Sequence, residues 1–205
     1  MNVLSIDFDW IMEPVIEAYN HISGSPVLKY DDCWNIIKKK LPDTKFYCNN
    51  NLLNKIFEIV EKFPNRIVIG ENHEEILQMI NDEPVDMLVN IDHHHDCYGF
   101  SLDRNNEIHC GNWVDYLFQN DLLGHYIWVT NYTSDPNQGK FNTYPSDKVE
   151  IDSNVDAILK FVKFDKIFLC LSPNWIPPQC LPLWKMLLNH YRTICENDAL
   201  RKSEE

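Results

Sequence analysis

Apolar residues follow two patterns along the chain, short continuous runs and longer stretches with helical spacing. The short runs are bounded by turn residues and predict strands at residues 2–8, 66–70, 85–91, 126–130 and 166–171. The longer stretches predict helices at residues 31 or 32 to 40, 49–63, 72–81, 112–120, 152–164 and 183–195. Short, continuously apolar strands that alternate with helices are typical of an α/β fold around a mainly parallel central sheet.

Acidic and histidine side chains stand where three of these strands end. Asp7 and Asp9 close the first strand, and they share one side of it if the extended geometry persists. His73 follows the second strand, and the third strand leads into residues 92–96, Asp-His-His-His-Asp. Because ligands bind outside the carboxyl ends of the strands in such sheets, we expect these side chains to gather at one edge.

The run at residues 92–96 has the composition of a metal site. Along an extended segment Asp92, His94 and Asp96 share a face, whereas His93 and His95 point away. Carboxylates and imidazoles are costly to bury together unless they bind cations. Hard carboxylate oxygens mixed with imidazole nitrogens suit Mn²⁺ better than a thiolate-rich zinc site would.

Each part of this cluster also has a simpler explanation. The histidine run fits a solvent-exposed turn, and Asp7 and Asp9 fit a helix-capping or loop pair. His73 fits a histidine packed at the start of a helix. The metal site is favoured because all of these residues fall at strand ends of one predicted sheet edge.

Charge and cysteine content indicate which classes of partner and which cellular compartment to expect. The formal charge of -13 argues against a nucleic-acid partner, which requires basic patches, and suits a cationic ligand. Seven cysteines without a regular framework are expected as free thiols in a reducing cytoplasm. Cys97 and Cys110 flank the candidate site and fit either nucleophiles or small buried packing residues. The chain begins with a strand-like segment and has no apolar run of transmembrane length, so we expect a cytoplasmic protein without a membrane partner.

The length of 205 residues predicts one domain over residues 1–205. Residues 131–150 are rich in Asn, Pro, Ser, Asp and Gly and carry no periodicity, and a loop of this length is usually functional or mobile. We expect this loop, with Tyr132, Phe141 and Tyr144, to act as a lid that contacts a peptide. The sequence leaves the oligomeric state open, a homo-oligomer included.

Three segments resemble the signatures of the ureohydrolases, the arginase and agmatinase family. Residues 70–73 (Gly-Glu-Asn-His) resemble Gly-Gly-Asp-His, residues 92–96 resemble Asp-Ala-His-x-Asp, and residues 5–9 (Ser-Ile-Asp-Phe-Asp) with residues 13–14 (Glu-Pro) resemble Ser-x-Asp-x-Asp-x-x-Asp-Pro. The last signature stands first here, although it follows the other two in arginases. The resemblance therefore implies a circularly permuted, three-layer arginase-like fold. Among permuted relatives the chain most resembles the peptide arginases, which form ornithine in ribosomally made peptides.

The resemblance also implies a metal centre with two Mn²⁺ ions. Its six ligands would be Asp7, Asp9, His73, Asp92, His94 and Asp96. Asp7 and Asp92 would bridge the two ions. His73 and Asp96 would complete one ion, and His94 and Asp9 the other.

Further positions are implied to contact the substrate. Residues 28–32 (Leu-Lys-Tyr-Asp-Asp) resemble the Tyr-Arg-Glu stretch of the family, whose carboxylate binds the substrate guanidinium. The resemblance gives this role to Asp32, with Asp31 as the second candidate. Both residues fit an acidic helix cap equally well. His109 lies at the family's spacing for the proton-shuttle histidine, or is an ordinary loop histidine. Tyr98 stands where arginases use an asparagine to hold the substrate α-carboxylate, and loss of that contact is expected if the arginine lies inside a peptide.

The implied function is hydrolysis of arginine side chains in a precursor peptide to ornithine and urea, a post-translational modification. One alternative is an agmatinase-like hydrolase of a small guanidino compound, which would keep the same site. A second is a zinc deacetylase-like enzyme, which needs one metal ion and fewer carboxylates. A third is a metal-stabilised binding protein without turnover.

Overall fold

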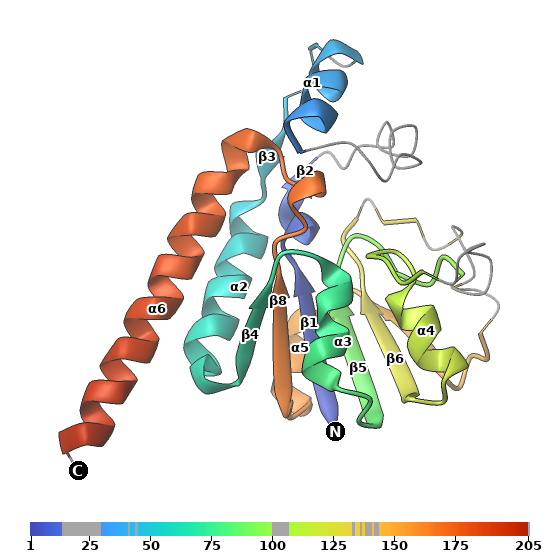
Figure 1. Ribbon diagram of the computed structural model, residues 1–205, viewed down its shortest axis with the longest axis vertical. Helices are drawn as coiled ribbons and strands as arrows, with labels where there is room; N and C mark the ends of the chain where they lie inside the picture. Colours follow the sequence, from blue (N-terminus) through green and yellow to red (C-terminus); the bar gives the residue numbers. More distant parts are fainter. Residues whose placement is uncertain are drawn as a thin grey trace. The chain divides into compact units, whose positions relative to one another are not determined.

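The structure is a computed structural model that describes residues 1–13, 30–40, 42–43, 45–99, 107–132, 134–135, 137, 141 and 144–204 (Figure 1). The side chains of residues 13, 30–33, 40 and 202–204 lie outside this description. The chain divides into two compact units. The sheet unit comprises Met1–Trp10 and Arg66–Leu171, and the second unit comprises Ile11–Asn65 and Ser172–Glu205. The expectation of one domain over residues 1–205 stays a prediction.

Within the described residues, the sheet unit is built on six parallel strands in the order β4-β8-β1-β5-β6-β7. Their bounds are β1 Asn2–Asp7, β4 Ile67–Gly70, β5 Val85–Ile91, β6 Leu123–Val129, β7 Val149–Asp152 and β8 Lys166–Cys170. β1 lies between β5 and β8, with Ile6 opposite Ile91 on one side and Leu169 on the other. Because every neighbouring pair is parallel, all carboxyl ends meet at one edge of the sheet.

Helices flank this sheet on both faces. α3 (Ile76–Ile80) and α4 (Trp113–Gln119) lie in front of the sheet in Figure 1, and α5 (Val155–Phe161) lies behind it. Trp113 and Leu117 of α4 are fully buried in one core cluster with Leu88 of β5 and Trp128 of β6. The predicted α/β fold with a parallel sheet is therefore confirmed, and the arrangement is consistent with three layers.

The second unit contains α1 (Tyr30–Lys40), α2 (Asn50–Lys62), α6 (Leu181–Glu204), the 3-10 turns η7 (Pro173–Trp175) and η8 (Pro178–Cys180), and the antiparallel pair β2 (Met12–Glu13) and β3 (Tyr47–Cys48). The predicted cap of α2 is present, since Asn49 Oδ1 accepts the backbone N–H groups of residues 51 and 52 at 3.0 and 3.2 Å. α2 and α6 lie side by side (Figure 1), and His190 Nε2 of α6 is 2.9 Å from Glu61 Oε1 of α2.

Several element boundaries differ from the predictions. The sequence predicts loop up to residue 150 and a helix from residue 152, but residues 149–152 form the edge strand β7. Glu150 and Ile151 of this strand are exposed. An exposed edge strand needs no continuous apolar run, which is why the pattern did not predict it. The helix predicted at residues 72–81 is a 3-10 turn, η4 (His73–Glu75), followed by the short α3. α6 runs on to Glu204, past the predicted end at Cys195. No helix among the described residues is both long and apolar enough to cross a membrane.

Candidate metal centre

Six acidic and histidine side chains come together at the carboxyl edge of the sheet. Asp7 is the last residue of β1, and Asp9 follows it in the 3-10 turn η1 (Phe8–Ile11). His73 is the first residue of η4, directly after β4, while Asp92, His94 and Asp96 follow β5. These are the six residues predicted as ligands. Their proximity is now a structural observation, while their role as ligands stays a prediction.

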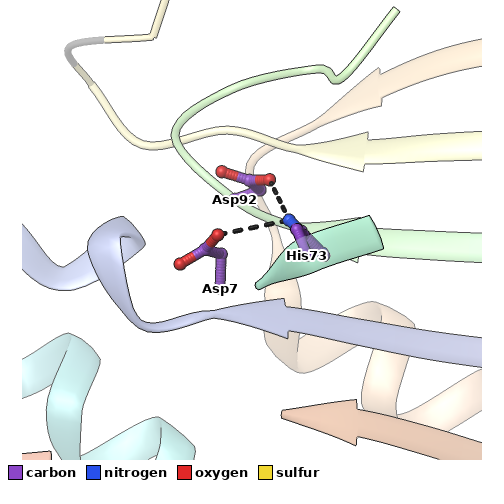
Figure 2. A group of neighbouring side chains, drawn as sticks. All are labelled: Asp7, His73 and Asp92. Carbon is purple, nitrogen blue, oxygen red and sulfur yellow. Dashed lines mark ion pairs between the residues drawn. The ribbon is translucent and has the colours of Figure 1, made fainter. Parts of the chain in front are cut away.

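One group of side chains surrounds the imidazole of His73. Its Nδ1 lies 3.2 Å from Asp7 Oδ2, 3.2 Å from Asp92 Oδ2 and 3.0 Å from Asp96 Oδ2. Figure 2 shows Asp7, His73 and Asp92 pointing toward one another from three different segments. One ligand atom from each of these three residues lies within 4.8 Å of the others, which is close enough for all three to hold one metal ion.

A second group surrounds the imidazole of His94. Its Nδ1 lies 3.1 Å from Asp9 Oδ2 and 3.8 Å from Asp92 Oδ1. Asp92 therefore faces His94 with one carboxylate oxygen and His73 with the other. The ligand atoms of Asp9, Asp92 and His94 also lie within 4.8 Å of one another, so Asp92 is shared by two groups that could each hold an ion.

The turn geometry that brings these residues together differs from the alternation predicted from the sequence. The extended geometry of β1 does not persist, because Asp9 lies in a 3-10 turn and its backbone N–H donates to Asp7 Oδ1 at 3.1 Å. After β5 the chain bends, and the backbone N–H of His94 donates to Asp92 Oδ1 at 2.8 Å. Asp96 has a φ of 52°, in the left-handed region that a residue with a side chain seldom adopts. Local turns, rather than strand alternation, aim these carboxylates into the site.

The turn that carries His73 is fixed by its neighbours. Glu75 Oε1 accepts the backbone N–H of Asn72 at 3.1 Å, and its Oε2 accepts that of Glu71 at 3.2 Å. A Cβ at Gly70 would overlap the ring of Phe168, so the strand that precedes His73 can end this close to β8 only with glycine.

The four carboxylates are buried, and this changes their protonation. Asp7, Asp9, Asp92 and Asp96 are each at most 3% exposed, and the ion pairs described for them are to His73 and His94. Burial, then Asp96 and Asp7, raise the pKa of Asp92 to about 6. Burial, then the charges of Asp7, Asp92 and Asp96, hold the pKa of Asp9 well above its ordinary value. The cluster is thus short of positive charge.

The pKa of the His73 imidazole is also raised, although burial acts on it in the opposite sense. Burial lowers its pKa, but the charge of Asp96 and hydrogen bonds with Asp7, Asp92 and Asp96 outweigh burial and raise the pKa well above its ordinary value. The metal-free protein therefore holds a proton on His73 in the position where a cation would be attracted.

Hydrogen-bond partners that the sequence did not single out orient these side chains. Ser5 Oγ lies 2.6 Å from His73 Nε2, so a proton on Nε2 can be donated to Ser5 while Nδ1 faces the carboxylates. Trp113 Nε1 donates to Asp96 Oδ2 at 2.6 Å. Asn90 Nδ2, in the buried strand β5, donates to Asp92 Oδ2 at 3.0 Å. An amide near the buried end of a mainly apolar strand was the sequence signal for Asn90.

The other two histidines of the run lie outside both groups. His95 is fully buried; its ring stacks on Tyr98 with centroids 4.4 Å apart, and its Nδ1 accepts the backbone N–H of Cys97 at 2.9 Å. His93 Nδ1 lies 3.3 Å from Asn131 Oδ1, and burial, then the charge of His94, lowers the pKa of His93 to about 3. Their contacts are those of packing residues, which matches the expectation that they point away.

Of the four residues predicted to contact substrate, the structure describes the side chains of His109 and Tyr98. His109 is exposed, and its Nδ1 accepts the backbone N–H of Gly111 at 3.1 Å, which places the proton of the neutral ring on Nε2. Tyr98 lies close enough to the cluster that burial, then Asp96, Asp92 and Asp9, raise its pKa. Asp31 and Asp32 lie in the first turn of α1, with side chains outside the described part of the structure. All four roles stay predictions.

The flanking cysteines do not have the environment of activated nucleophiles. Burial, then the charge of Asp96, raises the pKa of Cys97 well above its ordinary value. The same two causes raise the pKa of Cys110 to about 12. Since the thiolate is the reactive form, both thiols are protonated and unreactive near neutral pH.

Two aromatic residues of the expected lid are packed against the sheet unit instead. Phe141 is 3% exposed and lies against Trp128, with ring centroids 5.4 Å apart. Tyr144 stacks on Phe118 at 4.5 Å. Tyr132 is 73% exposed, in contrast to the buried Phe141.

The donor set fits a hard divalent ion. Carboxylate oxygens and imidazole nitrogens gather in a buried space that has more acids than imidazoles, and no thiolate belongs to either group. The cluster could therefore hold a metal ion. Comparisons with models of protein families, with curated proteins and with solved structures gave no match.

Proposed function

We propose that the protein is a binuclear manganese hydrolase that converts arginine side chains of a precursor peptide to ornithine and releases urea. The observation that carries this proposal is the pair of ligand groups that share Asp92. Two adjacent cation sites joined by a carboxylate are the arrangement that hydrolytic two-metal centres use. The resemblance of the three motifs to the ureohydrolase signatures supplies the reaction class.

The proposed ligands divide between the two ions. Asp7, Asp92, His73 and Asp96 would hold one ion, and Asp9, Asp92 and His94 would hold the other, with Asp7 as a second bridge. A pair of bound divalent ions lowers the pKa of water, so that hydroxide is available near neutral pH. Ser5, Asn90 and Trp113 keep the ligand side chains oriented through the hydrogen bonds described above.

The overall reaction adds water to the guanidinium carbon and breaks the bond between that carbon and the side-chain nitrogen. The electron pair of this bond stays on the nitrogen, which takes up two protons, equal in number to those of the added water, and leaves as the ornithine ammonium, with urea as the second product. His109 would act as the general acid in its imidazolium form, donating a proton to the departing nitrogen and returning to the neutral ring. Asp32 would bind the guanidinium by a charge-assisted pairing.

The sheet order makes the permuted arrangement physically reasonable. β1 pairs with β5, so the motif at the start of the chain meets the motif at residues 92–96 whatever their order in the sequence. Ligands need only meet in space, and chain ends can be moved at the surface of a domain. We therefore propose a circularly permuted, arginase-like fold.

The alternatives differ in features that can be measured. An agmatinase-like hydrolase would keep the same site and accept a small guanidino compound. A zinc deacetylase-like enzyme needs one ion and fewer carboxylates, whereas here a second group of ligands is built around His94. A binding protein without turnover would hold the metal and release no urea.

The test compares three substrates on protein whose manganese content has been measured. Free arginine, agmatine and a blocked pentapeptide with one central arginine are incubated separately, and urea is measured from each. We expect urea from the peptide. Urea from none of them with manganese bound would overturn the hydrolase proposal, and urea from free arginine or agmatine alone would overturn the peptide substrate.

Variants separate metal binding from catalysis. His109→Ala should keep the manganese and lose about 100-fold or more in rate, the scale of a general acid. Asp92→Asn should lose both manganese and urea formation. The matched control is His125→Asn, because His125 lies in β6 and pairs with Glu150 at 3.7 Å, outside both groups. Unchanged urea formation in His109→Ala would contradict the assigned role.

A further inference from the structure

Three sulfur atoms meet in the second unit. Met12 of β2 and Cys48 of β3 are register partners, and Cys48 Sγ lies 3.5 Å from Met12 Sδ. η8 packs against β3, and its last residue, Cys180, lies close enough to Cys48 for the two thiols to interact electrostatically. Three segments that are distant in the sequence thus form the three-sulfur cluster Met12, Cys48 and Cys180.

The cluster is held in place by its surroundings. Gln179 Nε2 donates to the backbone carbonyl of Phe46 at 3.3 Å, which ties η8 to the segment before β3. Met12 and Cys180 are each 3% exposed, whereas Cys48 is partly exposed. The sulfurs are therefore largely shielded from water, and one of them can be reached from outside.

The two thiols differ in acidity. The interaction with Cys180, then burial, raises the pKa of Cys48 well above its ordinary value. The same interaction lowers the pKa of Cys180. Cys180 is thus the thiol of the pair that gives up its proton more readily.

We propose that Met12, Cys48 and Cys180 form a binding site for the soft monovalent ion Cu(I). Thiolate and thioether sulfurs select Cu(I) over hard divalent ions, so Mn²⁺ would not compete for this cluster. The ion replaces the thiol protons and bonds to two thiolates and the thioether. Both protons are released to water, and neither copper nor sulfur changes its oxidation state.

The test is a titration of the full-length protein with Cu(I), carried out without oxygen and with ascorbate, in competition with bicinchoninate. We expect one tightly bound ion, which is lost in Cys48→Ser and in Cys180→Ser. Met12→Leu keeps the size and apolar character of the side chain, and it should weaken the affinity by at least about tenfold, the scale of losing a group that supports a metal ion. Cys195→Ser, a cysteine in α6, is the matched control and should bind as the unmodified protein does.

Circular dichroism shows which variants are folded, and the near-isosteric Met12→Leu tests the cluster even where a serine variant fails to fold. Tight Cu(I) binding that persists in both cysteine variants would overturn the proposal. So would a loss of two hydrogens by mass, showing a Cys48–Cys180 disulfide in place of bound copper. An affinity of folded Met12→Leu equal to that of the control would refute the role of the thioether.

Discussion

Binding of Mn²⁺ should release protons, chiefly from His73. In the metal-free protein the imidazole holds a proton between three carboxylates, and its pKa lies well above its ordinary value. A metal ion that binds Nδ1 must displace that proton. The observed affinity should therefore rise with pH around neutrality.

The magnitude follows from the number of protons released. Each released proton changes the affinity tenfold per pH unit, or about 1.4 kcal/mol. His73 supplies one proton, because its pKa is raised well above its ordinary value. Between about pH 6.5 and about 7.5 the affinity should rise by about tenfold. At saturating metal, the stabilisation of the folded protein should grow by about 3–6 °C in unfolding temperature.

Stability of the metal-free protein should change in the opposite direction. A raised histidine pKa contributes stability that is fully present below about pH 6.5 and is lost as the pH rises through the folded-state pKa. Asp92, with a pKa of about 6, acts in the same sense at lower pH, whereas the lowered pKa of His93 removes stability as the pH falls below about 6.5. The window above about pH 6.5 therefore reports on His73.

The assay is isothermal titration of Mn²⁺ near pH 7 in two non-coordinating buffers with different ionisation enthalpies, which counts released protons. Thermal unfolding with Mn²⁺ and with a chelator, at several pH values, gives the stabilisation. The control is His125→Asn, which removes a histidine outside both ligand groups and should release as many protons as the unmodified protein. Zero proton release, or a manganese-induced stabilisation that shrinks as the pH rises, would refute the reasoning.

Three further substitutions test single contacts. Ser5→Ala removes the hydrogen bond to His73 Nε2 and should weaken manganese binding by about tenfold or more in a competition titration; an unchanged affinity would deny the orienting role. Trp113→Phe removes the 2.6 Å donor to Asp96 and should cost about 1.5–3 kcal/mol of metal-free unfolding free energy, measured by denaturant titration; a loss below about 0.5 kcal/mol would contradict it. Asn49→Ala removes the α2 cap and should cost about 1 kcal/mol by the same method, with manganese affinity unaffected.

The pattern of the sequence was sufficient to place the acidic and histidine residues at one edge of a sheet. Strands that are apolar on both faces must be parallel and covered by helices, and their carboxyl ends then coincide. The residues that follow β1, β4 and β5 therefore had to lie near one another. The same pattern could not reveal β7, because an exposed edge strand buries little and needs no continuous apolar run.

The pattern of apolar and polar residues did not predict the local turns at the site. Alternation predicts which side chains share a face only while the chain stays extended, and at this edge it does not. Asp9 reaches the site through a 3-10 turn, and Asp96 through its own left-handed backbone conformation. The candidate ligands do lie together as expected, but local turns rather than strand alternation bring them there. Phe141 is a case in which the expected position was wrong. Because it is an aromatic residue in an irregular segment, it was expected to contact a peptide, but its side chain is packed against the sheet unit.

The sequence by itself determined the class of fold and the set of candidate ligands, because both depend on local composition and on the shared direction of parallel strands. Only the tertiary structure decided that Ser5, Asn90 and Trp113 orient the cluster. It also brought together Met12, Cys48 and Cys180. These contacts join residues from different elements, and their geometry follows from how strands and turns pack rather than from spacing along the chain.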